Sequence, residues 1–116
     1  MQVKVNPTAV EHALQLIGEG KYRINSVWRD NRPTPEALAR FAATHGVDEA
    51  SRWYLGENLD APAGSPERFV YPIGDFSNVH ETGIRAARER AAVDGQDDLA
   101  DAAESVLELF YRMNAC

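Results

Sequence analysis

The sequence predicts a single α+β domain over residues 1–116 in which helices dominate. Three patterns support this fold class: apolar residues recur at helical spacing in four or five segments, two short aromatic segments resemble strands, and the last third contains two helical patterns joined by a glycine. We therefore expect four to five helices, a small antiparallel strand pair and a C-terminal antiparallel helical hairpin. A chain of 116 residues can bury one modest core.

The first predicted helix begins after Asn6, a favourable N-cap, with Pro7 at its first position, and it ends near Gly18. Its apolar stripe consists of Val10, Ala13, Leu14 and Ile17. The alternation in residues 21–28, KYRINSVW, favours a strand.

A second helix is predicted to start at Pro35, capped by Thr34, and to end at Gly46. One face of this helix carries Leu38, Phe41, Ala42 and His45. Residues 47–56 leave two alternatives open: a short helix capped by Asp48 that carries Trp53 and Tyr54, or a strand RWYLG. That strand could pair with RFVY, residues 68–71, across a loop rich in proline and glycine.

The last third predicts two helices, Asn78–Ala92 and Asp97–Arg112, with Asp75 or Ser77 capping the first. The short link around Gly95 makes them an antiparallel hairpin. Small residues on both helices allow close packing, namely Gly83, Ala86, Ala87, Ala91, Ala102 and Ala103. The second of these helices is expected to place six apolar residues on one face: Leu99, Ala102, Ala103, Val106, Phe110 and Met113. Three arginines of the first of these helices could face the acids of the second; they are Arg85, Arg88 and Arg90.

Composition and charge disfavour several classes of function. The net charge is −6, and residues 94–116 hold six acids but only Arg112 as a base, so nucleic-acid binding is not expected. No apolar run approaches the roughly 20 residues of a membrane helix, and the N-terminus lacks a secretory signal, so we expect a cytoplasmic protein. Neither a cofactor nor a metal site is predicted, because nucleotide-binding, serine-hydrolase and zinc motifs are missing.

Residues 68–83, RFVYPIGDFSNVHETG, are the most informative segment, because they combine aromatic residues, a Pro–Gly turn, a carboxylate and an imidazole. Asp75 and His80 are the candidate catalytic pair, in which His80 is a general acid or base and Asp75 orients it. The alternative is that Asp75 is an N-cap and His80 a packing residue. The candidate binding residues, which could equally form the core, are Trp53, Tyr54, Phe69, Tyr71 and Phe76.

The block YPIGDFSNVHETGIRAARERA resembles a (F/Y)PxGDFxxVHxxGxxAAxxRA pattern shared by a group of short bacterial proteins that carries no assigned activity. The resemblance extends to NPTAVEHALQLI and RWYLG, and it implies a bacterial source. By resemblance, the signature positions are Pro72, Gly74, Asp75, Phe76, Val79, His80 and Gly83. Arg or Lys is usual around the histidine in that group, whereas this chain has Ser77, Asn78 and Glu81, which argues against an anion site there.

Three functions are compatible with these residues. The favoured one is a binding or accessory protein that engages a protein, a peptide or a small molecule through the aromatic segment 68–80, with a homo-oligomer left open. The second is a small enzyme with His80 in an aromatic pocket. The third is a carrier or substrate protein modified at Cys116, the single cysteine, in a tail expected to fray.

Overall fold

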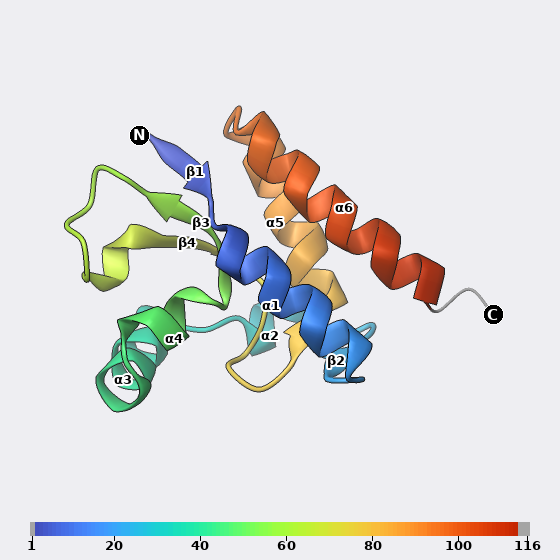
Figure 1. The fold of residues 1–116 in the computed structure, drawn as a ribbon, viewed down its shortest axis with the longest axis horizontal. Helices are drawn as coiled ribbons and strands as arrows, with labels where there is room; N and C mark the ends of the chain where they lie inside the picture. The colour runs from blue at the N-terminus through green and yellow to red at the C-terminus, as the bar shows by residue number, and fades with distance from the viewer. Residues whose placement is uncertain (1, 114–116) are drawn as a thin grey trace.

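The computed structural model describes residues 2–113 and confirms an α+β fold dominated by helices (Figure 1). The elements in chain order are β1 (Val3–Val5), α1 (Pro7–Gly18), β2 (Tyr22–Arg23), α2 (Trp28–Asn31), α3 (Pro35–His45), α4 (Val47–Ser51), β3 (Tyr54–Asn58), the 3-10 helix η1 (Pro66–Arg68), β4 (Phe69–Pro72), β5 (Val79–His80), α5 (Glu81–Val93) and α6 (Asp97–Met113). Two of the α-helices, α2 and α4, are single turns.

The predicted strand pair is confirmed as the antiparallel hairpin β3–β4, with Tyr54 opposite Pro72 and Glu57 opposite Phe69. A strand that we did not predict, β1, pairs antiparallel with the free edge of β3 and completes a three-stranded sheet. Its sequence, VKV, alternates apolar and polar residues, but a three-residue strand is too short for periodicity to reveal.

The strand predicted in residues 21–28 is confirmed only for Tyr22–Arg23, which form β2. This strand pairs in parallel with β5, a strand that the sequence did not predict. The chain then turns at Asn25, whose φ is 59°, and residues 28–31 form the helical turn α2. Asn tolerates this left-handed conformation better than most residues do, which explains the early end of the strand.

The first two long helices begin where the sequence predicts. Thr34 caps α3 by accepting a hydrogen bond of 3.1 Å from the Ala37 N–H. Asn6 occupies the N-cap position of α1, but its side-chain amide instead donates to the Ser51 and Tyr54 carbonyls, at 2.9 and 3.3 Å. This buried amide therefore ties the start of α1 to the start of β3.

Both alternatives for residues 47–56 are partly right. Residues 47–51 form the short helix α4, with Gly46 rather than Asp48 at its N-cap. Trp53 follows the helix, and Tyr54 begins the strand β3.

Helix α5 starts at Glu81, three residues later than predicted, and its N-cap is His80 rather than Asp75 or Ser77. The reason is a tight turn before the helix: Gly74 and Val79 form an antiparallel bridge, and Val79 and His80 pair with β2. The carboxylate of Asp75 does accept backbone N–H groups, from Ser77 and Asn78, but inside this turn.

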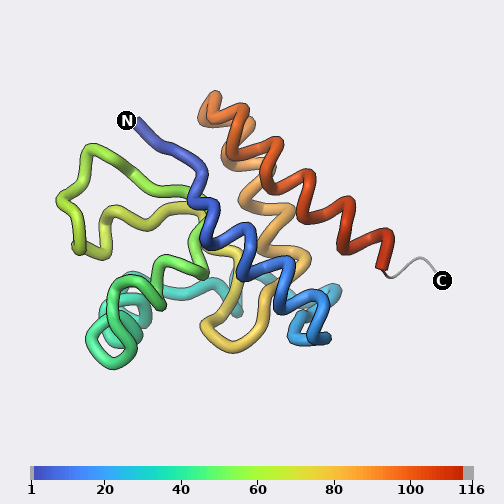
Figure 2. Tube along the Cα trace, viewed as in Figure 1, coloured from blue at the N-terminus to red at the C-terminus, as the bar shows by residue number. Residues whose placement is uncertain are grey.

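The predicted C-terminal hairpin is confirmed: α5 and α6 pack against each other and form one side of the molecule (Figures 1 and 2). Both helices also contact the three-stranded sheet, whereas α3 and α4 lie at the other end of the molecule (Figure 1). The largest fully buried side chains of the core include Ile17, Leu55, Ile73, Ile84, Leu99, Leu107 and Phe110.

The small-residue seam of the hairpin is partly as predicted. Ala91 and Ala103 are completely buried, but Met113 is exposed, and the unpredicted Leu107 is buried in its place. Gly83 does not serve the seam, because a Cβ there would lie 2.8 Å from the Trp28 ring of α2. Of the three arginines, only Arg88 meets an acid of α6, Glu104 at 2.6 Å. Arg85 and Arg90 pair instead with Glu81 and Asp94, each four residues away.

Replacing Ala91 or Ala103 with Leu should lower the free energy of unfolding by about 1–3 kcal/mol, because the added methyl groups have no space in a close-packed interface. Ala92→Leu, at an exposed position of α5, is the matched control and should stay within about 0.5 kcal/mol of wild type. Urea titration of the three variants provides the measurement. Wild-type stability in both seam variants would contradict this packing.

Candidate functional site

The five aromatic candidates do not form one exposed surface. Four of them are buried and Phe76 is half-buried; the buried four are Trp53, Tyr54, Phe69 and Tyr71. Phe76 stacks on Phe41 of α3, with ring centroids 4.3 Å apart, and the edge of Trp53 meets Phe76 at 6.1 Å. Most of these rings therefore hold α3 and the turn before α5 onto the sheet.

Trp53 is held by a glycine of the predicted signature. A Cβ on Gly74 would overlap the Trp53 ring, so only a residue without a side chain allows this packing. The opposite partner of the indole is the His12 ring of α1, edge-on at 4.8 Å. Trp53 is therefore a core residue that joins α1 to the turn of residues 74–79.

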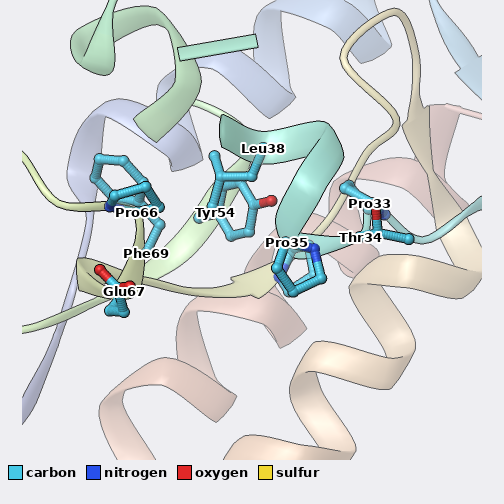
Figure 3. A pocket seen from close by; sticks show the side chains of 9 residues that line it. Pro33, Thr34, Pro35, Leu38, Tyr54, Pro66, Glu67 and Phe69 are labelled. Atoms are coloured by element: carbon cyan, nitrogen blue, oxygen red, sulfur yellow. The ribbon is translucent and has the colours of Figure 1, made fainter. Parts of the chain in front are cut away.

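Tyr54 and Phe69 differ from the others because they line a hollow of about 290 Å³ between α3 and the β3–β4 hairpin (Figure 3). We call this hollow the proline groove, because four of its nine lining residues are proline. Its lining consists of Pro33, Thr34, Pro35, Leu38, Tyr54, Pro66, Glu67, Phe69 and Pro72.

The proline groove contains one hydroxyl that has no hydrogen-bond partner among residues 2–113 and reaches solvent. No fully buried side-chain nitrogen or oxygen in that range lacks a partner. Tyr54 is only 4% exposed, and no residue within 2–113 forms a hydrogen bond with its hydroxyl. Burial raises the pKa of this hydroxyl to about 12, so it remains a hydrogen-bond donor at neutral pH. In Figure 3 the hydroxyl points toward the Thr34–Pro35 end of the groove, away from Pro66 and Glu67. An acceptor entering the groove would satisfy it.

Tyr71 lies apart from Phe69, although regular strand pleating would place both on the same face. Its φ of 62° breaks the pleating. Tyr71 lines a second hollow, of about 330 Å³, between α2, β4 and α5. Its hydroxyl donates to an Asp94 carboxylate oxygen at 2.7 Å. Burial, helped by this hydrogen bond and by the negative charge of Asp94, raises the pKa of Tyr71 to about 12.

The two catalytic candidates do lie together. The imidazole of His80 is 2% exposed, and its Nε2 lies 2.9 Å from an Asp75 carboxylate oxygen. The other ring nitrogen, Nδ1, lies 2.7 Å from the Ser26 hydroxyl, which in turn lies 3.0 Å from the Thr82 hydroxyl. The Trp28 ring packs near the imidazole, at 5.5 Å between centroids. His80 and Asp75 line neither of the two hollows described above, so the structure brings the pair together but not at the base of an aromatic pocket.

The Asp75 carboxylate is held in its ionised form. Partial burial alone would raise its pKa, but hydrogen bonds from the Asn78 N–H, from His80 and from the Ser77 N–H outweigh burial and lower it. The result is a carboxylate that accepts three hydrogen bonds through two oxygens.

Sequence reasoning missed Ser26 and the prolines of the groove. No local signal marks Ser26, which lies 54 residues before His80 and meets it only through the β2–β5 pairing. The sequence shows these prolines only as residues that mark loops. They meet around Tyr54 because α3 packs against the hairpin.

Comparison of the chain with protein-family models, with curated proteins and with solved structures found no match. Within residues 2–113, no helix combines the length and the apolar character that crossing a bilayer requires. The same part of the chain has no cluster of three or more His, Cys, Asp or Glu side chains placed to hold a metal ion. Cys116, the candidate modification site, lies outside the described residues.

The two buried tyrosines allow a direct test of the unpartnered hydroxyl. Tyr71→Phe should lower the free energy of unfolding by about 1 kcal/mol, because it removes the hydrogen bond to Asp94. Tyr54→Phe should change it by less than about 0.5 kcal/mol, because no internal hydrogen bond is lost. Chemical denaturation of both variants measures the difference. An equal loss in both would mean that the Tyr54 hydroxyl is bonded within the protein.

The pKa of Asp75 predicts a loss of stability in acid. Because folding lowers this pKa, the ionised carboxylate stabilises the protein above the unfolded value of about 4, and that contribution disappears as the pH falls through the lower folded value. Asp75→Asn should therefore be less stable than wild type at pH 7, and the difference should shrink below about pH 4. Thermal melting from pH 2.5 to 7 is the measurement, with Asp101→Asn, at an exposed position of α6, as control. A difference that stays constant across this range would contradict the assignment.

Proposed function

We propose that this protein is a binding protein whose proline groove takes an extended peptide segment of a partner protein. The observation that carries the proposal is the Tyr54 hydroxyl, which faces the groove, reaches solvent and has no hydrogen-bond partner among residues 2–113. An acceptor delivered by a ligand would replace water at this donor, and a neutral hydrogen bond of this kind contributes about 0.5–1.5 kcal/mol.

The chemistry of the groove suits a peptide. Its walls are mainly aliphatic and aromatic, and the Tyr54 hydroxyl is a donor at one point along them, with Thr34 and Glu67 as the other polar lining residues. A backbone carbonyl beside an apolar side chain presents the complementary pattern, and aromatic-lined grooves are a recurring means of recognising extended segments. The volume of about 290 Å³ lies at the lower end of the range for ligand pockets, which fits one or two side chains better than a large cofactor.

The shape of the groove is set before a ligand arrives. Proline fixes its own φ near −65°, so Pro33, Pro35, Pro66 and Pro72 leave the walls little freedom to lose on binding. Leu38 is buried, and Phe69 packs near Tyr54, with ring centroids 5.9 Å apart. Binding therefore requires little reorganisation of the protein.

The negative charge of the protein indicates which residues should flank the apolar residue of the partner segment. Glu67 lies at the groove and is exposed, and the whole chain carries a net charge of −6. A segment with Lys or Arg beside its apolar residue would be attracted to this surface, mainly through a faster association rate. The proposed ligand is thus an extended segment that combines apolar and basic residues.

Selection of a random peptide phage library on the immobilised protein tests the proposal. Enriched peptides should carry apolar residues next to Lys or Arg, and in NMR titrations they should shift the signals of Leu38, Tyr54 and Phe69. Tyr54→Phe should weaken their binding by roughly 2- to 10-fold, the value of one neutral hydrogen bond. Tyr71→Phe, which changes a hydroxyl in the other hollow, is the matched control and should bind normally. Enriched peptides that shift the signals of another face, or that bind Tyr54→Phe as tightly as wild type, would overturn it.

A further inference from the structure

A second site lies away from the proline groove, in a line of hydrogen bonds between four side chains. The line runs from Thr82 through Ser26 and His80 to Asp75, with separations of 3.0, 2.7 and 2.9 Å. Each residue comes from a different segment: Ser26 from the loop after β2, Asp75 from the turn before β5, His80 from β5 and Thr82 from the first turn of α5. The imidazole at its centre is buried, whereas Ser26 is half-buried.

An ionised Asp75 beside a neutral His80 fixes the direction of every hydrogen bond in this line. An ionised carboxylate can only accept, so the Nε2 atom of His80 must carry the hydrogen in that contact. In the neutral imidazole, Nδ1 then has a free lone pair, and it accepts the hydrogen of the Ser26 hydroxyl. The Thr82 hydroxyl in turn donates to the oxygen of Ser26. The Ser26 hydroxyl therefore directs its proton at Nδ1 of His80, and the contact of Nε2 with Asp75 fixes the tautomer of the imidazole.

Two residues close to Ser26 in sequence are apolar and exposed. Its neighbours Ile24 and Val27 are 48% and 56% exposed, which places two of the exposed large apolar side chains of residues 2–113 on either side of the serine. Between them, Asn25 adopts a φ of 59° and turns the chain sharply before the serine. In sequence, the serine thus lies between two solvent-exposed apolar residues, which favours an uncharged apolar substrate.

We propose that Ser26 is a catalytic nucleophile for acyl transfer from esters with an apolar acyl chain, with His80 as general base and Asp75 as the residue that orients it. The arrangement has the roles of a Ser–His–Asp triad, although the two ring nitrogens exchange partners relative to the serine-protease template. This proposal does not depend on the proline groove, since none of its residues lines that groove.

The reaction balances with water as the only co-reactant. The Ser26 Oγ bonds to the ester carbonyl carbon while its proton moves to Nδ1 of His80. The carbon–oxygen bond to the alcohol then breaks, and the alcohol leaves with that proton. Water next attacks the acyl-serine, gives a proton to Nδ1 and releases the acid, and Nδ1 returns the proton to Ser26. Asp75 stays ionised throughout and stabilises the imidazolium.

An alkyl fluorophosphonate tests the nucleophile directly, because it forms a stable adduct with an activated serine. We expect one adduct per folded protein, located at Ser26 by peptide mass spectrometry, and slow hydrolysis of p-nitrophenyl butyrate. Ser26→Ala should abolish both, and Asp75→Asn should reduce both about 100-fold, because the base loses its orienting charge. Ser105→Ala, at an exposed serine of α6, is the matched control and should leave both unchanged.

The outcomes separate an active site from a structural tether. Far-UV circular dichroism verifies that each variant is folded, and the Asp75→Asn protein serves if Ser26→Ala unfolds. An adduct at Ser26 that requires Asp75 supports the proposal. No adduct in folded wild type, or an adduct formed equally fast in Asp75→Asn, would overturn it and leave the line as a tether. Tyr54→Phe should label normally, so a failure of peptide binding and a failure of labelling are distinguishable.

Discussion

The buried imidazole of His80 is the contact on which the middle of this fold depends. Its Nδ1 is hydrogen-bonded to the Ser26 hydroxyl and its Nε2 to the Asp75 carboxylate. The imidazole therefore joins two loops at the point where α5 begins. A parallel pair of two-residue strands is too short to be stable alone, and the side-chain line runs beside it. Because a buried polar group without partners would cost about 1–3 kcal/mol, the buried imidazole requires the partners that Ser26 and Asp75 supply.

The long helices were predictable because their signals are local, whereas the single turn α2 was not predicted. Pro7 and Pro35 mark helix starts, Thr34 caps as expected, and the apolar repeat of α6 follows a helical period, with Leu107 as the omission. Elements that depend on distant partners escaped prediction: β1 exists because Val3–Val5 meets an edge of β3, and β5 exists because Tyr22 lies beside Val79. The predicted start of α5 was wrong for the same reason, because Val79 and His80 pair with β2 and so are not part of the helix.

The candidate site shows the same difference between local and long-range signals. Asp75 and His80 are five residues apart, so one turn brings them together, and their contact could be expected from the sequence. Ser26 could not, because nothing in KYRINSVW distinguishes it, and a triad is recognised by geometry rather than by position. The aromatic residues 69–76 were expected on one surface, but left-handed backbone at Tyr71 and Phe76 sends their side chains to different places. Such conformations are uncommon outside glycine and have no reliable sequence signature.

Tyr71 and Phe76, the two left-handed residues of this region, lie in the segment that runs from the proline groove to Asp75 and His80. A left-handed non-glycine residue costs roughly 1–3 kcal/mol and persists only where its surroundings determine it. Tyr71 is held by its hydrogen bond to Asp94, and Phe76 by stacking on Phe41. With Tyr71 turned toward α5, only Phe69 and Pro72 of β4 remain beside Tyr54, and the prolines complete that groove. Phe76 lies inside the turn of residues 74–79, in which Asp75 accepts hydrogen bonds from the Ser77 and Asn78 N–H groups and meets His80. Left-handed backbone at these two positions therefore accompanies both the proline groove and the contact between Asp75 and His80.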